Sequence, residues 1–113
     1  MPKLKKTSIN ADTLMMWAKR KLGPSRCKRI LIVDRKSTDY GWYDWAGSIY
    51  INIRQLGSMA SVYRTVAHEW THAQQTYGRY SKLHKKWGYK DNPYEIAARQ
   101  RERTCFSKLL ITF

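Results

Sequence analysis

Residues 65–75 read TVAHEWTHAQQ, with two histidines four residues apart and a glutamate directly after the first. On a helix this spacing sets both imidazoles on one face, about one turn apart, where their nitrogens can converge on one ion. Glu69 is offset by about 100° and therefore lies beside that ion, where a general base takes a proton from the attacking water. The order His68-Glu69-x-x-His72 is the metallohydrolase signature, which predicts a metal site.

The residues around this motif, 58–77, have the period of a helix, and Gly78 lies where that helix would end. Its apolar residues gather in one stripe of about 100°. The stripe consists of Met59, Val62, Tyr63, Val66, Trp70, Ala73 and Tyr77. His68 and His72 fall on the opposite side of the wheel, so we expect them to point away from the core that the stripe fills.

The spacing of apolar residues, together with residues that begin or end helices and turns, predicts the remaining elements. Asn10 caps a first helix that ends before Gly23-Pro24, and Asn92-Pro93 begins a last helix after a loop of about fifteen residues. Ile30–Val33 is expected to be a buried strand. Alternation predicts an antiparallel hairpin, with strands over Tyr40–Trp45 and Ser48–Ile53 joined by a turn at Ala46-Gly47. The prediction is a single α+β domain over residues 1–113: an N-terminal helix, a small three-stranded sheet with an antiparallel edge hairpin, the motif helix and a C-terminal helix.

A catalytic zinc ion needs three protein ligands and leaves a fourth position for water. A metzincin would have glycine at position 75 and histidine at 78, where this chain has Gln75 and Gly78, so that class is excluded. Glu95, 23 residues after His72, is the preferred third ligand, although it could instead close a capping box at the start of the last helix. His84, in the polar loop SKLHKKWGYKDN, is the alternative, although its lysine neighbours also suit a solvated histidine.

Three stretches resemble the small zincin metallopeptidases: HEWTH, NPYEIAAR and YDWAGSIYI. The second resembles the third-ligand segment of minimal gluzincins and of ImmA/IrrE-like peptidases, and the third resembles the edge strand before the thermolysin active-site helix. The resemblance covers roughly residues 10–108. It implies a zincin fold with one Zn²⁺ per chain on His68, His72 and Glu95, and hydrolysis of peptide bonds with Glu69 as the general base.

The resemblance also makes residues 40–45 the edge strand that pairs with an extended peptide or protein substrate. Its substrate-facing residues would be Trp42, Tyr43, Asp44 and Trp45. The oxyanion needs a second donor besides zinc, and four residues are within reach. These candidates are Tyr77, Tyr80, His84 and Tyr94, among which the sequence does not choose.

One position departs from the thermolysin pattern. Four residues after the ligand glutamate, those enzymes have an aspartate that supports a zinc-bound histidine, whereas this chain has Arg99. Support for the histidine must then come from another group, such as Glu102 one turn further along, or it is missing. The loss of this support would weaken catalysis more than metal binding.

The SprT-like family is a rival resemblance. Its members carry a third histidine in a loop after the motif, followed by an aromatic residue, and they act near DNA. The stretch LHKKWG is loosely similar, because Trp87 follows His84 by three residues. On this hypothesis His84 would replace Glu95 as the third ligand.

The charge of the chain is strongly positive, with 22 lysines and arginines against 8 aspartates and glutamates, a formal net charge of +14. Such a field favours phosphate backbones, anionic lipid heads or acidic proteins. A second hypothesis is therefore a basic nucleic-acid-binding module in which the metal site is structural or vestigial, although no nucleic-acid motif is readable. A third is a viral or mobile-element structural protein that keeps a zincin fold without turnover.

No segment approaches the roughly 18 to 20 consecutive apolar residues of a membrane span. The basic N-terminus MPKLKK is not followed by the continuous apolar stretch of a signal peptide. The sequence therefore predicts a cytoplasmic protein.

Overall fold

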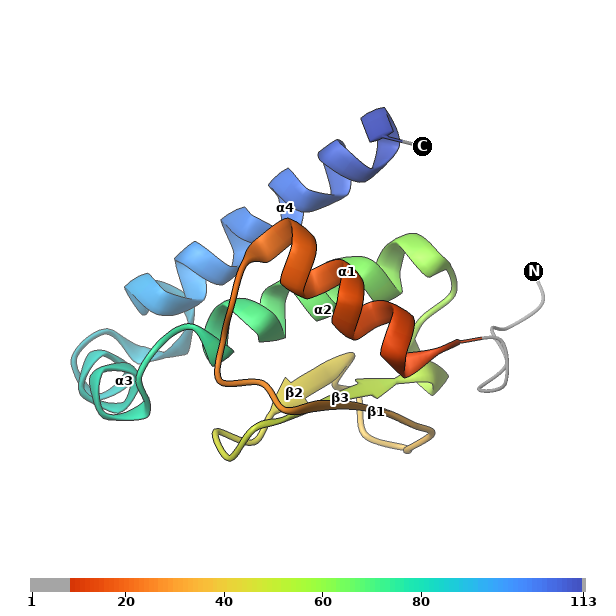
Figure 1. Cartoon of the computed structure of the whole chain (residues 1–113). Helices are drawn as coiled ribbons and strands as arrows, with labels where there is room; N and C mark the ends of the chain where they lie inside the picture. The colour runs from red at the N-terminus through yellow and green to blue at the C-terminus, as the bar shows by residue number, and fades with distance from the viewer. Residues whose placement is uncertain (1–8, 113) are drawn as a thin grey trace.

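The computed structural model describes residues 9–112, over which four α-helices and one three-stranded mixed sheet form an α+β architecture (Figure 1). Residues 1–8 and 113 of the predicted domain lie outside this range. In chain order the elements are α1 (Ala11–Leu22), β1 (Arg29–Val33), β2 (Gly41–Tyr43), β3 (Ser48–Asn52), the short 3-10 helix η2 (Ile53–Gln55), α2 (Met59–Ala73), α3 (Tyr77–Asp91) and α4 (Pro93–Thr112).

The sheet has the strand order β1-β3-β2, so β3 is central and β2 is an edge strand. β2 runs antiparallel to β3, which confirms the predicted hairpin, while β1 runs parallel to β3. The expectation of a buried first strand was wrong, because burial alternates along β1: Ile30 and Ile32 are buried, but Leu31 is 38% exposed. In Figure 1 the described helices lie on one face of the sheet, and the alternation along β1 puts Leu31 on the other face.

α2 lies at the centre of the fold, in contact with α1, β2, β3 and α4. Four of its stripe residues, Val62, Val66, Trp70 and Ala73, are in the hydrophobic core. The Ser58 and Ser61 side chains close a capping box at its start. The helix ends at Ala73 rather than near residue 77.

α3 occupies the stretch that we expected to be a loop, and this is the largest correction to the predicted fold. None of its residues is buried, and the stretch contains two glycines and few aliphatic residues, which favoured a loop over a helix in the sequence. Its regular geometry is interrupted at Gly88, which has φ 74° and ψ −176°. Glycine adopts this conformation readily because it has no Cβ.

The edge strand β2 is held close to α2 by two features. A Cβ on Gly41 would lie 2.5 Å from the Tyr50 carbonyl oxygen and 2.7 Å from Thr65 Cγ2, so only glycine allows this approach. Asn52, which is fully buried, donates to the carbonyl oxygen of Asp39 (3.0 Å) and accepts from the backbone N–H of Arg35 (2.9 Å). These bonds fix the loop that leads into β2. Simple alternation with Ile49, Ile51 and Ile53 would instead put Asn52 on the solvent side of its strand.

α4 begins where the sequence indicates, since the Asn92 side chain accepts from the backbone N–H of Tyr94 at 2.9 Å. It runs over 20 residues to Thr112. Across residues 9–112, no helix has both the length and the apolar character needed to cross a membrane.

Candidate metal centre

Two histidines from α2 and a glutamate from the first turn of α4 meet in the interior. One ligand atom from each of His68, His72 and Glu95 lies within 4.8 Å of the others. The Nε2 atoms of both histidines lie 3.1 Å from the same carboxylate oxygen, Oε1 of Glu95. Two imidazole nitrogens and a carboxylate suit zinc and other divalent first-row metals, so this group could hold a metal ion.

The burial of this group results from the packing of α4 against α2. Glu95 is 2% and His72 5% exposed, although both are polar. The histidines lie on the side of α2 away from its apolar stripe, and α4 covers that side. Because buried charges are costly unless they are paired or bind a metal, this placement points to a ligand role rather than a solvated surface.

Each imidazole is oriented by a second hydrogen bond at its other nitrogen. Nδ1 of His68 lies 2.7 Å from Oε2 of Glu102, and Nδ1 of His72 lies 2.8 Å from Oε1 of Gln75. With Nδ1 donating to these acceptors, both Nε2 atoms are left to face Glu95, which is the usual arrangement of metal-binding histidines. Arg99 therefore does not leave His68 without support, because Glu102 supplies it.

Tyr80 connects α3 to the centre. Its hydroxyl donates to Oε2 of Glu95, the carboxylate oxygen that does not face the histidines. The Trp45 ring packs against Tyr80 and His72, with centroid distances of 5.0 and 5.7 Å. These contacts hold the Glu95 carboxylate in one orientation.

Burial and neighbouring charges shift the pKa of His68, Glu95 and Glu69. Burial opposes the charged form of His68, but hydrogen bonds with Glu102 and Glu95 outweigh it and raise the pKa of His68 to about 10. Burial also opposes ionisation of Glu95, yet its hydrogen bonds with His68, His72 and Tyr80 hold its pKa well below the usual range. Burial raises the pKa of Glu69 to about 7. Three carboxylates around two imidazoles thus create a field that favours a cation.

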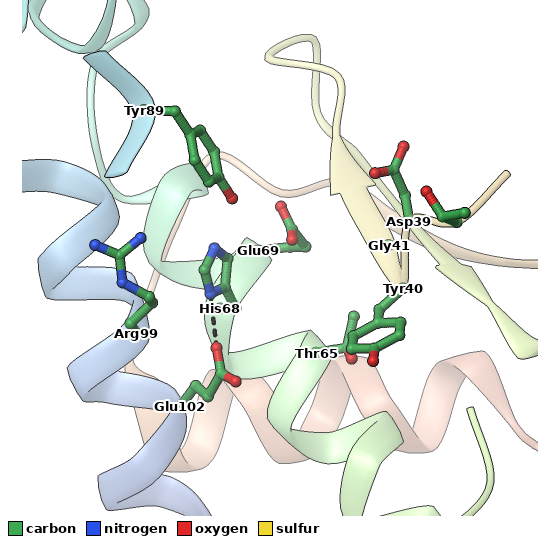
Figure 2. Close-up of a pocket in the computed structure, with 10 residues that line it drawn as sticks. Asp39, Tyr40, Gly41, Thr65, His68, Glu69, Tyr89, Arg99 and Glu102 are labelled. Atoms are coloured by element: carbon green, nitrogen blue, oxygen red, sulfur yellow. Dashed lines mark hydrogen bonds and ion pairs between the residues drawn. The ribbon is translucent and has the colours of Figure 1, made fainter. Parts of the chain in front are cut away.

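A hollow of about 370 Å³ opens directly on His68 and Glu69. In Figure 2 these two side chains lie between Tyr40 and Gly41, at the start of the edge strand, and Tyr89 and Arg99 on the helical side. A second hollow of about 220 Å³ also contains His68 and Glu69, and it is lined in addition by His72, Tyr80 and Glu95. Glu69 therefore borders both the candidate ligand group and open space.

The structure brings Glu95, rather than His84, to the two histidines. His84 is exposed on α3, with its ring stacked on Tyr80 at a centroid distance of 6.3 Å. Tyr77 is 59% exposed and packs against Trp45. Tyr94 contributes its carbonyl oxygen, which accepts from Gln75 Nε2 at 3.1 Å. Among the described residues, Tyr80 is thus the only one of the four proposed donors that lines a hollow at these ligands, and it lines the second one alone.

Tyr89 lines both hollows and is absent from the candidates that the sequence suggested. Figure 2 shows its hydroxyl directed toward Glu69 and His68. It follows Gly88, whose positive φ breaks the regular helix. A glycine directly before a tyrosine is the sequence signal that could have identified it.

The predicted substrate strand is shorter than residues 40–45. Trp42 and Tyr43 belong to β2, whereas Asp44 and Trp45 form the turn that follows. Tyr43 is buried against the core, and Asp44 accepts from the backbone N–H groups of Ala46 and Ser48 at 2.8 and 3.0 Å. Trp42 and Trp45 line the second hollow, while Asp44 organises the turn.

Glu102→Ala should lower zinc affinity by about 10- to 100-fold, because the imidazole of His68 would lose the carboxylate that orients it. Competition with a chromogenic zinc chelator measures this change. Asp91→Ala, at an exposed carboxylate at the end of α3, is the matched control and should keep wild-type affinity. Equal affinity in all three proteins would contradict the supporting role of Glu102.

The function of the centre has to be inferred from its own geometry and chemistry. Comparison of the chain with protein-family models, with curated proteins and with solved structures finds no match.

Proposed function

We propose that this chain is a zinc-dependent metallopeptidase with a minimal zincin fold of the gluzincin type. His68, His72 and Glu95 are the metal ligands, and Glu69 is the general base. The observation that carries the proposal is the convergence of these three ligands in a buried site, with Glu69 beside them in hollows bordered by an edge strand.

The donor set fits zinc. Three protein ligands with oriented imidazoles are the arrangement that catalytic zinc sites use, with the fourth position left for water or substrate. When bound, zinc supplies Lewis-acid polarisation of a carbonyl and makes water a stronger nucleophile at neutral pH. The grouping of Glu95 with the histidines favours the gluzincin ligand set over the SprT-like set with His84.

Glu69 moves the protons of the reaction. It follows His68 on α2 and lines both hollows, so its carboxylate can take a proton from the attacking water. The same carboxyl group then delivers that proton to the leaving amine, which separates the two products.

The edge strand β2 positions the substrate. Its side away from β3 has no strand neighbour among residues 9–112, so an extended peptide can add to the sheet there. Gly41, Trp42 and Tyr43 line the second hollow together with Glu69, which places a peptide paired with β2 across the general base.

Two tyrosines from α3 have different roles in this proposal. Tyr80 already donates to Glu95, so it positions a metal ligand. Tyr89 lines both hollows, and its hydroxyl can donate to the oxyanion that develops on the scissile carbonyl. Tyr89 thus takes the role for which the sequence suggested four other residues.

The test is metal-dependent cleavage of unfolded proteins and of a mixed fluorogenic peptide library by the purified chain. We expect cleavage with about one zinc per chain, loss after treatment with a chelator, and recovery when zinc is restored. Zinc that binds stoichiometrically and stabilises the fold without any cleavage would instead support the alternative of a structural or vestigial metal site. Cleavage that survives complete zinc removal would contradict the proposal.

A further inference from the structure

Acidic residues are concentrated at the metal centre, which leaves the rest of the chain strongly basic. Glu69, Glu95 and Glu102 are three of the 8 acidic residues in the sequence, and all three surround the two histidines. The remaining five face 22 lysines and arginines. By count, the positive charges of the chain therefore far exceed its remaining carboxylates.

α3 carries the clearest row of cations. Arg79, Lys82 and Lys86 follow one another at intervals of three and four residues, which places them within about 60° on one face of the helix. All three are exposed, and residues 77–90 contain no acidic residue. At 1.5 Å per residue the row is about 10 Å long. That length corresponds to about three phosphates of one strand in a nucleic-acid helix.

This row points away from the metal centre. Tyr80 and His84, which pack toward Trp45 and His72 or stack on each other, lie on the other side of the same helix. Figure 1 places α3 at one end of the molecule, beside the start of α4. The cationic row is consequently available to a large partner without competing for the substrate hollows.

An exposed aromatic ring contacts the last cation of the row. Trp87 is 50% exposed, and Nζ of Lys86 lies 5.3 Å from its ring centroid. Cations that follow a phosphate backbone, combined with an aromatic ring on which a base can stack, are the features that bind single strands without sequence preference.

We propose that α3 is a single-stranded nucleic-acid binding surface, in which Arg79, Lys82 and Lys86 contact successive phosphates and Trp87 stacks on a base. A membrane surface fits less well, because a helix that lies on lipid needs an apolar face directed outward. Here the outward row is cationic. This inference does not depend on peptidase activity, since the row and the ring lie outside the metal centre.

The experiment measures binding of the zinc-loaded full chain to a fluorescently labelled oligothymidylate by anisotropy, between roughly 50 and 200 mM salt. The triple variant Arg79→Ala/Lys82→Ala/Lys86→Ala should bind more weakly, and the slope of log affinity against log salt should decrease by about two. Alanine is the strongest helix former, and all three positions are exposed, so the variant should keep its helix. Circular dichroism verifies this.

A second triple variant separates a local site from the net charge. Lys19→Ala/Arg20→Ala/Lys21→Ala removes the same charge from the last turn of α1, which packs on α2 and β1. It should keep most of the wild-type salt slope. Equal loss in the two triple variants would overturn the proposal, because attraction would then follow net charge alone.

Trp87→Ala tests the stacking contact. It should lower affinity for the oligothymidylate by about tenfold and leave affinity for a duplex unchanged. Equal loss on the single strand and the duplex, or no loss on either, would refute the stacking role.

Sedimentation with phosphatidylserine vesicles provides the last comparison. If the α3 variant loses vesicle binding but keeps its affinity for the oligonucleotide, the surface recognises lipid and the proposal fails.

Discussion

Glu69→Gln is expected to slow peptide hydrolysis by about 10²- to 10⁴-fold while the chain keeps its zinc. Glutamine has nearly the same shape as glutamate but cannot accept the proton of the attacking water. The proposed metal ligands are untouched, since Glu69 is outside the group formed by the two histidines and Glu95. Hydrolysis of the best fluorogenic peptide, measured together with zinc content on the same preparation, checks both parts.

Asp91→Asn is the matched control, because it makes the same carboxylate-to-amide change at an exposed site at the end of α3. It should hydrolyse the peptide at the wild-type rate. Should Glu69→Gln lose its zinc, the role of Glu69 as a base beside the metal would be wrong. Should it keep full activity, another group must be the base.

Glu95→Ala is expected to reduce zinc from about one per chain to near zero after dialysis, because two histidines alone do not complete a catalytic zinc site. His84→Ala should keep the wild-type zinc content, since His84 is exposed and outside the ligand group. Elemental analysis of the three proteins, purified side by side, measures the difference.

Glu95→Gln separates metal binding from packing. Glu95 is buried and accepts from Tyr80, so the alanine variant also removes packing and a hydrogen bond, whereas glutamine keeps the volume and an acceptor. We expect the glutamine variant to fold as the wild type does and to bind zinc weakly. If instead His84→Ala loses zinc and Glu95→Ala retains it, the third ligand is the SprT-like histidine.

The sequence predicted the elements whose signals are local. Asn10 caps α1 as expected, with its side chain accepting from the backbone N–H groups of Asp12 and Thr13. The apolar stripe of α2 and the hairpin of β2 and β3 follow from periods of 3.6 and 2 residues. The His68-Glu69-x-x-His72 pattern needs only helical geometry to set two imidazoles on one face, and the structure has that geometry.

Features that depend on tertiary packing could not be predicted in this way. α3 has no buried face, and its two glycines and four lysines resemble a loop, although Tyr77, Tyr80 and Trp87 do fall on one side of it. The burial of His72 depends on α4, whose packing against α2 cannot be deduced from α2 alone. Asn52 has the polarity of a surface residue, yet its side chain satisfies loop backbone groups in the interior.

The contact at Gly41 has a mechanical consequence for the two walls of the cleft. On the strand side, the β2 backbone touches the Tyr50 carbonyl and the Thr65 methyl with no space for even one added carbon, so this wall cannot move closer to α2. On the opposite side, α3 has no buried residue, and its regular geometry is interrupted at Gly88. The strand wall is therefore closely packed, whereas the α3 wall is held by the Tyr80–Glu95 hydrogen bond and by surface contacts. On the proposed function, adjustment to the width of a bound peptide falls to the part of α3 after Gly88, which carries Tyr89.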